Sequence, residues 1–562
     1  MATFKEAIIL KFSDKVVYQI YPKSFSDSNG DGLGDIRGII GKLDYIASLG
    51  VDYIWSTPIF VSPMNDNGYD VVNYCEIDPC FGTMADVEEL IAEAEKRGIG
   101  LMFDMVLCHT SIEHEWFKRA LEGDKQYQRY YILRDGRNKK SADDSGEPPT
   151  NWQCAFGGSA WQWEPRLKKW YLHLHDVSQP DLDWTNPKVR EELAKIVRFW
   201  KDKGVKGFRF DVINLISKPE VFEDDTEGLG RKLFADGAHV HEYLRELIQN
   251  AGIDGMMTVG EMASTDLENC IRYSNPAEHE LSMTFSFHHL KVDYKDGDKW
   301  SLMPADIPAL KKIFERWQVG MAQENGWNAL FWCNHDQPRA VSRFGDDEKF
   351  HDESAKMLAA AIHFMRGTPY IYQGEELGMT NAKYNSIEQY RDVESLNYHK
   401  ILLEQGKSET EALKIIGERS RDNSRTPMQW SAEKYAGFSS VEPWISSPDN
   451  FTRFNVEAEE RNKNSVLNFY RELVRLRKSK KIISDGAIEF IERENPDVLA
   501  YRRTLDDASL IVLCNFRSVV GSLYEKTLAD YFAQGYKKIL GNHDSVTENL
   551  RPFEVVVLEK QM

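Results

Sequence analysis

Eight short apolar runs, rich in β-branched and aromatic residues, alternate along this chain with longer amphipathic segments. Runs of this kind predict buried strands, and amphipathic segments such as 84–97 and 189–203 predict surface helices. Eight strands alternating with helices favour a parallel (β/α)8 barrel, an α/β fold also called a TIM barrel. In the last run, Pro369 can donate no ladder hydrogen bond, so this strand is the least regular. The predicted strands are residues 16–21, 53–57, 101–106, 207–212, 256–261, 283–287, 329–334 and 368–373.

Two parts of the chain depart from the alternation and predict additions to the barrel. The gap after the third strand is too long for one helix and has a polar tip, which predicts a small inserted domain over residues 108–171. After residue 481 short strands replace the helical pattern, which predicts a C-terminal antiparallel β-sandwich over 482–562. The barrel itself would then comprise residues 1–107 and 172–481.

Composition and charge exclude several classes of protein. The 562 residues carry a net charge of −19, so nucleic acids and anionic membranes are poor partners. No apolar run approaches the ~20 residues of a membrane span, and no signal peptide is recognised. The seven cysteines are scattered, which indicates neither a disulfide framework nor a zinc site. We expect a soluble cytoplasmic protein; the sequence indicates no oligomeric state.

Charged residues gather where the predicted strands end. In (β/α)8 barrels, polar residues at the carboxyl ends of strands are typical of an active site. Several carboxylates at one barrel mouth are electrostatically costly, so a purely structural explanation is disfavoured. The residues at these strand ends are Asp104, His109, Arg209, Asp211, Glu261, His335 and Asp336.

This set of acids suits glycoside hydrolysis, which needs an ionised and a protonated carboxyl group across the scissile bond. Arg209 and Asp211 share one face of their strand, so the arginine should keep Asp211 ionised as a nucleophile. Glu261 would serve as acid and then base. Asp336 would hold sugar hydroxyls and stabilise the transition state.

The segments that contain these residues resemble the signature regions of the α-amylase family of glycoside hydrolases, and the resemblance runs from residue 18 to the C-terminal domain. It implies Asp211 as nucleophile, Glu261 as acid/base and Asp336 as transition-state stabiliser. It also implies that Tyr69 stacks on the sugar that is cleaved. The residues that the resemblance places around this sugar are Asp66, Tyr69, His109, Arg209, His335 and Arg425.

Two features bear on calcium. The first signature region usually ends Asn-His but here reads Cys108-His109; because Cys lacks an amide, an amylase-type calcium site is not expected there. The loop 27–35 spaces oxygen ligands two residues apart, as in the first half of an EF-hand loop, although a Gly-rich turn with solvated acids is the alternative. Related α-glucosidases have a similar loop, which favours structural Ca²⁺. The predicted ligands are Asp27, Asn29, Asp31, the carbonyl of Leu33, and Asp35.

The choice of sugar depends on the acceptor side. The loop 31–35, the segment 367–376 and Val212 resemble the oligo-1,6-glucosidase subfamily, which removes one terminal glucose from short α-glucosides. Where that subfamily has an acidic residue this chain has His288, and Lys291 and Lys299 follow. Replacing an acid by His288 and adding Lys291 shifts the charge in the cation direction, which a phosphorylated leaving sugar would require. The segment resembles members that hydrolyse trehalose 6-phosphate, although each lysine could instead be a solvated loop residue.

Three alternatives stay open at this point. An oligo-1,6-glucosidase or dextran glucosidase acting on isomaltose-like sugars would keep every catalytic residue. A sucrose isomerase would use the same chemistry but return the glucosyl unit to fructose. A non-catalytic scaffold relative would usually lack catalytic acids and carry a membrane anchor, whereas this chain keeps all three acids.

Overall fold

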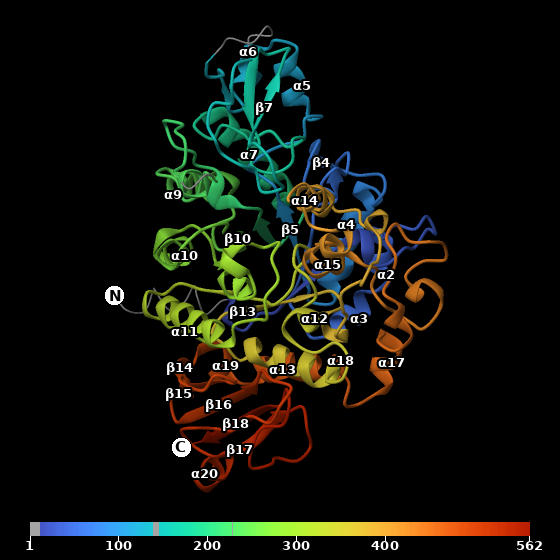
Figure 1. Ribbon diagram of the computed structural model, residues 1–562, viewed down its shortest axis with the longest axis vertical. Coiled ribbons are helices and arrows are strands. Elements are labelled where there is room, and N and C mark those ends of the chain that lie inside the picture. The colour runs from blue at the N-terminus through green and yellow to red at the C-terminus, as the bar shows by residue number, and fades with distance from the viewer. Residues whose placement is uncertain (1–11, 139–144, 227–228, 562) are drawn as a thin grey trace.

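One parallel eight-stranded sheet forms the centre of the molecule. The computed structural model describes residues 12–138, 145–226 and 229–561. The strand order is β11-β10-β9-β5-β2-β1-β13-β12, and a parallel bridge between Thr284 and Asn328 brings the two edges together. The predicted barrel is therefore confirmed, and its sheet is nearly closed. Figure 1 shows it at the centre of the molecule. Its strands are β1 (Val17–Ile20), β2 (Tyr53–Ser56), β5 (Gly100–Met105), β9 (Gly207–Phe210), β10 (Met257–Glu261), β11 (Met283–Phe285), β12 (Ala329–Leu330) and β13 (Thr368–Tyr372).

The strands are short and buried on both faces, as expected for a parallel sheet covered by helices. Every residue of β1, β9 and β13 is buried. Pro369 is the second residue of β13 and lies opposite Leu330 of the two-residue strand β12. The ladder is thus shortest beside the residue that cannot donate to it.

Amphipathic helices surround the barrel, and several begin with the capping residues expected at helix starts. Thr83 and Asp86 form a capping box on α4, and Asn186 caps α7 ahead of Pro187. The helices between the barrel strands are α2 (Ile36–Gly41), α3 (Leu43–Ser48), α4 (Met84–Lys96), α7 (Pro187–Asp202), α8 (Arg231–Phe234), α9 (Val240–Ala251), α10 (Leu267–Ser274), α11 (Ile307–Gln323), α12 (Ala340–Phe344) and α13 (His351–His363). Those that follow the last strand are α14 (Val393–Glu404), α15 (Glu409–Arg419), α16 (Asp422–Arg425), α17 (Val456–Arg461), α18 (Val466–Ser479) and α19 (Lys481–Asp485).

The segment between β5 and β9 extends beyond one end of the barrel (Figure 1). It contains α5 (Glu115–Leu121), α6 (Lys125–Gln128) and an antiparallel sheet of β6 (Leu133–Arg134), β8 (Lys169–Leu172) and β7 (Trp161–Glu164). A separate antiparallel pair, β3 (Phe60–Val61) and β4 (Asn73–Ile77), follows β2. Strand β8 ends one residue beyond the predicted inserted domain, whose bounds stay a prediction.

The C-terminal part is one five-stranded antiparallel sheet, where the sequence analysis expected a sandwich. Its order is β14 (Ala487–Ile491), β15 (Val498–Leu505), β16 (Ala508–Asn515), β18 (Val555–Gln561) and β17 (Lys537–Gly541). On β16, Val512 belongs to the barrel core, whereas Ile511 and Leu513 pack in a separate cluster with residues of α20 (Leu528–Ala533). The barrel helices cover one face of this sheet and α20 covers the other. Both faces of the described sheet are therefore buried without a second sheet.

None of the helices in the described part of the chain is both long enough and apolar enough to cross a membrane.

Candidate active site

The carboxyl ends of three neighbouring strands bring the predicted catalytic acids together. Strands β5, β9 and β10 are adjacent and parallel, with Asp104 and Val259 on either side of Arg209 in the ladder. Asp211 directly follows β9, and Glu261 is the last residue of β10. Asp211 and Glu261 therefore lie at the same end of the barrel.

The guanidinium of Arg209 lies between three carboxylates. Its Nη1 donates to Oδ1 of Asp104 and to Oδ1 of Asp211, each at 2.7 Å. Its Nη2 contacts Glu261, and the arginine side chain is only 1% exposed. One buried cation thus partly offsets the charge of three acids and fixes the orientation of the Asp211 carboxylate. The predicted pairing of Arg209 with Asp211 is confirmed.

Asp104 positions the groups around it. Its Oδ2 accepts hydrogen bonds from Trp55 Nε1 at 3.1 Å and from the Tyr69 hydroxyl at 2.9 Å. Burial raises the pKa of Asp104 to about 7, although Arg209 acts in the opposite direction. Asp104 therefore connects Arg209 to Tyr69, the residue predicted to stack on the sugar.

Asp336 is held by three cationic or potentially cationic side chains. Arg425 Nη2 and Arg421 Nη1 lie 2.8 and 3.3 Å from its Oδ1, and His335 Nε2 lies 2.9 Å from its Oδ2. Burial by itself would raise the pKa of Asp336, but these neighbours hold it well below its usual value. On the far side of the imidazole, Gln19 Nε2 lies 2.8 Å from Nδ1, which leaves Nε2 to carry the proton toward Asp336.

The remaining residues predicted to hold the sugar surround this centre. The Tyr69 ring stacks on His335 at a centroid distance of 5.2 Å, and His109 Nε2 lies 3.1 Å from the Tyr69 carbonyl. Asp66 Oδ1 lies 2.9 Å from Arg421. Burial raises the pKa of Asp66 to about 7, and Arg421 opposes the shift. The residues that the structure brings together here are Asp66, Tyr69, His109, Arg209, His335 and Arg425; their roles toward substrate stay a prediction.

The backbone turns sharply after the predicted nucleophile. Val212 has φ 34°, a left-handed conformation that is strained for a β-branched residue. Val212 is the N-cap of a short helical turn, η2 (Ile213–Leu215), and Asp211 lies between Val212 and the end of β9 at Phe210. The buried thiol of Cys108 donates to the Val212 carbonyl at 3.5 Å. The residue that replaces the usual Asn thus contacts this turn.

A cavity of about 230 Å³ lies beside Glu261. Lys291, at the end of the helical turn η4 (His288–Lys291), lines it together with Arg231 from α8. His175 and Tyr294 add polar groups to the wall. If Glu261 is the proton donor to the leaving sugar, as predicted, this cavity, hereafter the acceptor cavity, is the acceptor side of the site.

Two other residues predicted for the acceptor side, His288 and Lys299, do not line this cavity. His288 packs on Trp317 at a centroid distance of 4.7 Å, and burial lowers its pKa to about 4. It is therefore neutral near pH 7. A neutral histidine in place of an acidic residue still shifts the charge in the predicted cation direction, although His288 adds no positive charge of its own. Lys299 donates to both carboxylate oxygens of Glu394, at 2.6 and 2.8 Å, so its charge is already paired with a carboxylate that also lies 3.5 Å from Arg421.

The loop proposed to bind calcium is closed by its own hydrogen bonds. Asp27 accepts from the amides of Gly30 and Gly32 at 2.7 and 2.9 Å, and Asp31 accepts from the amide of Leu33. Asp35 instead caps α2 through Gly38 and also accepts from Ser28. The oxygen donors suit a hard cation. However, no group of three or more His, Cys, Asp or Glu that could hold a metal occurs among the described residues, so calcium stays a prediction.

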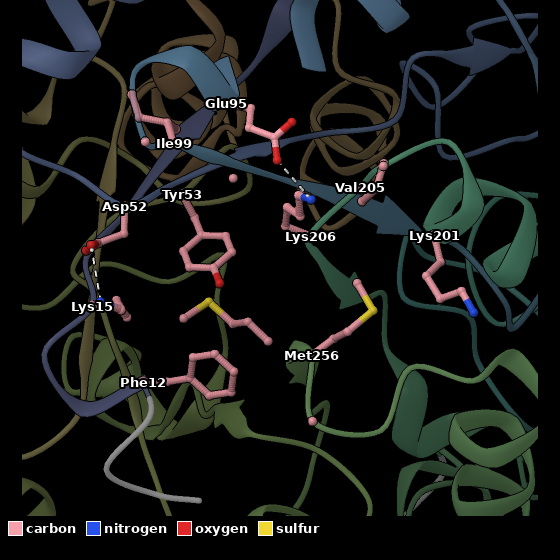
Figure 2. Close-up of a pocket in the computed structure, with 15 residues that line it drawn as sticks. Phe12, Lys15, Asp52, Tyr53, Glu95, Ile99, Lys201, Val205, Lys206 and Met256 are labelled. Atoms are coloured by element: carbon pink, nitrogen blue, oxygen red, sulfur yellow. Dashed lines mark ion pairs between the residues drawn. The ribbon is translucent and has the colours of Figure 1, made fainter. Parts of the chain in front are cut away.

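A larger cavity, of about 590 Å³, lies at the opposite end of the barrel (Figure 2). Tyr53 and Gly100 are the first residues of β2 and β5 and line this cavity. Figure 2 shows two ion pairs on its wall, Lys15 with Asp52 and Lys206 with Glu95. The predicted catalytic acids lie at the other ends of the strands, so this cavity is not the candidate active site.

Arg421, which no sequence motif indicated, connects the residues around Asp66 with those around Asp336. Arg421 Nη2 lies 2.6 Å from Asp392 and 2.9 Å from Asp66, while its Nη1 reaches Asp336. Its only local signal is its place four residues before Arg425, which puts both on one side of a helical turn. Asp392 and Asp66 lie far from it in sequence, so no local pattern indicates their pairing.

A family model for the α-amylase catalytic domain matches residues 19–486. The chain belongs to the α-amylase family, whose members include glycoside hydrolases, and the barrel with its cluster of acids agrees with that assignment.

Particular relatives are similar over nearly their full lengths. The chain is 48% identical to the trehalose-6-phosphate hydrolase of Bacillus subtilis (strain 168), covering 96% of this chain and 97% of the relative. It is 43% identical to the oligo-1,6-glucosidase of Bacillus cereus, covering 98% and 99%. The crystal structure of Bacillus licheniformis trehalose-6-phosphate hydrolase is 49% identical in sequence with a TM-score of 0.91, covering 98% of this chain and 100% of that chain.

Proposed function

We propose that this protein is a retaining α-glucosidase that hydrolyses α,α-trehalose 6-phosphate to glucose and glucose 6-phosphate. Support comes from the 48% identity to a trehalose-6-phosphate hydrolase over nearly the whole chain. The observation that carries the choice of substrate is the position of Lys291 in the cavity beside Glu261. A lysine there can bind a phosphate on the leaving sugar.

In the first half-reaction, Asp211 attacks the anomeric carbon of the unphosphorylated glucose. Glu261 donates a proton to the bridging oxygen, the bond from that oxygen to the anomeric carbon breaks, and glucose 6-phosphate leaves. Contact with the same guanidinium keeps the two carboxyl groups near each other. Retaining enzymes place these groups about 5 Å apart.

In the second half-reaction, water replaces glucose 6-phosphate beside Glu261. The carboxylate of Glu261 now takes a proton from this water, whose oxygen attacks the anomeric carbon and displaces Asp211. Glucose leaves with its α-configuration. Asp336, kept ionised by its cationic neighbours, stabilises the positive charge that develops on the sugar in both transition states.

Product analysis tests the proposal. The purified protein is incubated with trehalose 6-phosphate, trehalose and isomaltose at equal concentrations, and glucose and glucose 6-phosphate are measured enzymatically. We expect equimolar glucose and glucose 6-phosphate from trehalose 6-phosphate, released faster than glucose from either neutral sugar. Faster cleavage of isomaltose would overturn the proposal.

The second candidate is an oligo-1,6-glucosidase. It is supported by the 43% identity to such an enzyme over 98% of the chain. Both candidates need the same three acids, so the acceptor cavity distinguishes them. The leaving sugar of an oligo-1,6-glucosidase is neutral, so such an enzyme does not need two cations, here Lys291 and Arg231, in its acceptor cavity.

Two further properties complete the proposal. We place the enzyme in the cytoplasm, because all seven cysteines are free thiols.

We also retain structural calcium in the 27–35 loop as a prediction from the sequence. Thermal unfolding after EGTA treatment tests it: added Ca²⁺ should raise the Tm of the native chain but not that of Asp31→Ala.

A further inference from the structure

Two cations from different parts of the chain line the acceptor cavity. Lys291 ends the turn η4 after β11, and Arg231 begins α8, between β9 and β10. Both side chains are exposed. Glu261, the predicted acid/base, lines the same cavity of about 230 Å³.

Within the described ranges, neither Lys291 nor Arg231 has a carboxylate partner. Two other lysines, by contrast, are paired. Lys299 is paired with Glu394 at 2.6 Å, and Lys218 is paired with Asp181 at 2.8 Å. The surrounding protein lowers the pKa of the Lys291 amine, and the positive charge of Arg231 lowers it further. Two cations that repel each other across a cavity would be stabilised by an anion placed between them.

The rest of the cavity wall suits the sugar that carries such an anion. Burial lowers the pKa of His175 to about 3, so its ring is neutral, and its Nδ1 is buried without a hydrogen-bond partner in the described structure. Gln153 adds an amide, and Phe287 adds an apolar ring. Neutral polar groups and a ring are typical of a monosaccharide site, and the cations add charge at its edge.

We infer that Arg231 is a specificity-determining residue that binds the phosphate of the leaving sugar together with Lys291. This inference rests on the proposed function, which it deepens by naming the second phosphate contact. The planar guanidinium offers paired donors to a phosphate, and the lysine adds a point charge. Lys299, already bound to Glu394, takes no part.

The test compares Arg231→Gln with a matched control, Lys232→Gln, which removes the same charge from the adjacent exposed residue of α8. For each variant, kcat and KM are measured with trehalose 6-phosphate and with p-nitrophenyl α-glucoside, which has no phosphate. We expect Arg231→Gln to raise KM for trehalose 6-phosphate about 10- to 100-fold, the effect of losing a hydrogen bond to a charged group. Its kinetics with the nitrophenyl substrate should be unchanged, and Arg231→Lys should restore part of the affinity.

The outcomes separate this inference from the function on which it rests. If the native enzyme does not prefer trehalose 6-phosphate over trehalose, the proposed function fails. If the native enzyme has that preference but Arg231→Gln keeps its KM, only the role of Arg231 is overturned. An equal loss with both substrates would also overturn it, because that result indicates a structural role. Competitive inhibition by inorganic phosphate gives a second readout and should weaken in Arg231→Gln but not in Lys232→Gln.

Discussion

Arg209 donates a hydrogen bond of 2.7 Å to Asp211, two residues further along the chain, and the same guanidinium contacts Glu261. The proposed nucleophile and the proposed acid/base therefore share one buried cation. Without it, two carboxylates at one barrel mouth would repel each other, and the Asp211 carboxylate would lose the hydrogen bond that orients it.

Arg209→Gln should therefore lower kcat strongly. We expect a loss of about 100- to 1,000-fold, comparable to the removal of one preorganised electrostatic contact at a reacting group. Steady-state hydrolysis of p-nitrophenyl α-glucoside measures it, with Arg37→Gln on the surface of α2, whose side chain is 59% exposed, as control. A kcat within about threefold of the native value would show that the pairing is only structural.

The roles of the two acids predict different pre-steady-state behaviour. Glu261→Gln should still form the glucosyl-enzyme from p-nitrophenyl α-glucoside, because nitrophenolate leaves without a proton, but should hydrolyse it about 100- to 10,000-fold more slowly. We expect a burst of nitrophenol equal to the enzyme concentration, and faster turnover when azide replaces water. Asp211→Asn should give no burst. A burst from Asp211→Asn would reverse the assignment.

A pH effect on stability is expected from Glu375, directly after the turn that follows β13. Burial raises its pKa from 4.5 to about 8, although the Tyr470 hydroxyl donates to it at 2.8 Å. The folded protein then binds more protons than the unfolded chain between these values, so the free energy of unfolding should fall as pH rises from about 5 to 8.

Urea unfolding across this pH range checks the expectation. Glu375→Gln keeps an oxygen for Tyr470 but cannot ionise, so its stability should fall less steeply with pH than that of the native chain. Glu489→Gln, at a side chain 59% exposed, serves as control and should follow the native curve. Parallel slopes for Glu375→Gln and the native protein would contradict the assignment.

Lys291 and Lys299 should differ in what their removal changes. Lys291→Gln should raise KM for trehalose 6-phosphate with little effect on p-nitrophenyl α-glucoside, because the lysine lines the acceptor cavity. Lys299→Gln removes the nearer cation from the buried Glu394, which keeps Arg421 at 3.5 Å, so it should lower the Tm and affect both substrates alike. Substrate-selective loss in Lys299→Gln would mean that this lysine binds the phosphate.

Local patterns were sufficient to predict the barrel and the position of its acids. Period and length identify strands, and in a parallel barrel every strand end lies at the same rim, so Asp211 and Glu261 had to lie near each other. Arg209 was predictable as a partner because it is two residues from Asp211 on the same strand face.

Partners that are distant in sequence could not be predicted in this way. Lys299 and Glu394 are 95 residues apart, so the lysine looked like a free cation in the sequence. The sequence indicated that His288 replaces an acidic residue, but not that burial would keep the histidine neutral. Arg231 went unnoticed because it lies outside every signature region, on a four-residue helix that only the tertiary fold brings to the cavity.

The most direct test of the central proposal is the ratio of kcat/KM for trehalose 6-phosphate to kcat/KM for trehalose, measured on one preparation of the native enzyme. The two sugars differ only in the phosphate, so the ratio isolates its recognition. Loss of a charge-assisted contact costs about 10- to 100-fold, and two cations should give a ratio of at least about 100. A ratio near one would contradict phosphate recognition and leave a glucosidase of the same fold and chemistry with a neutral substrate.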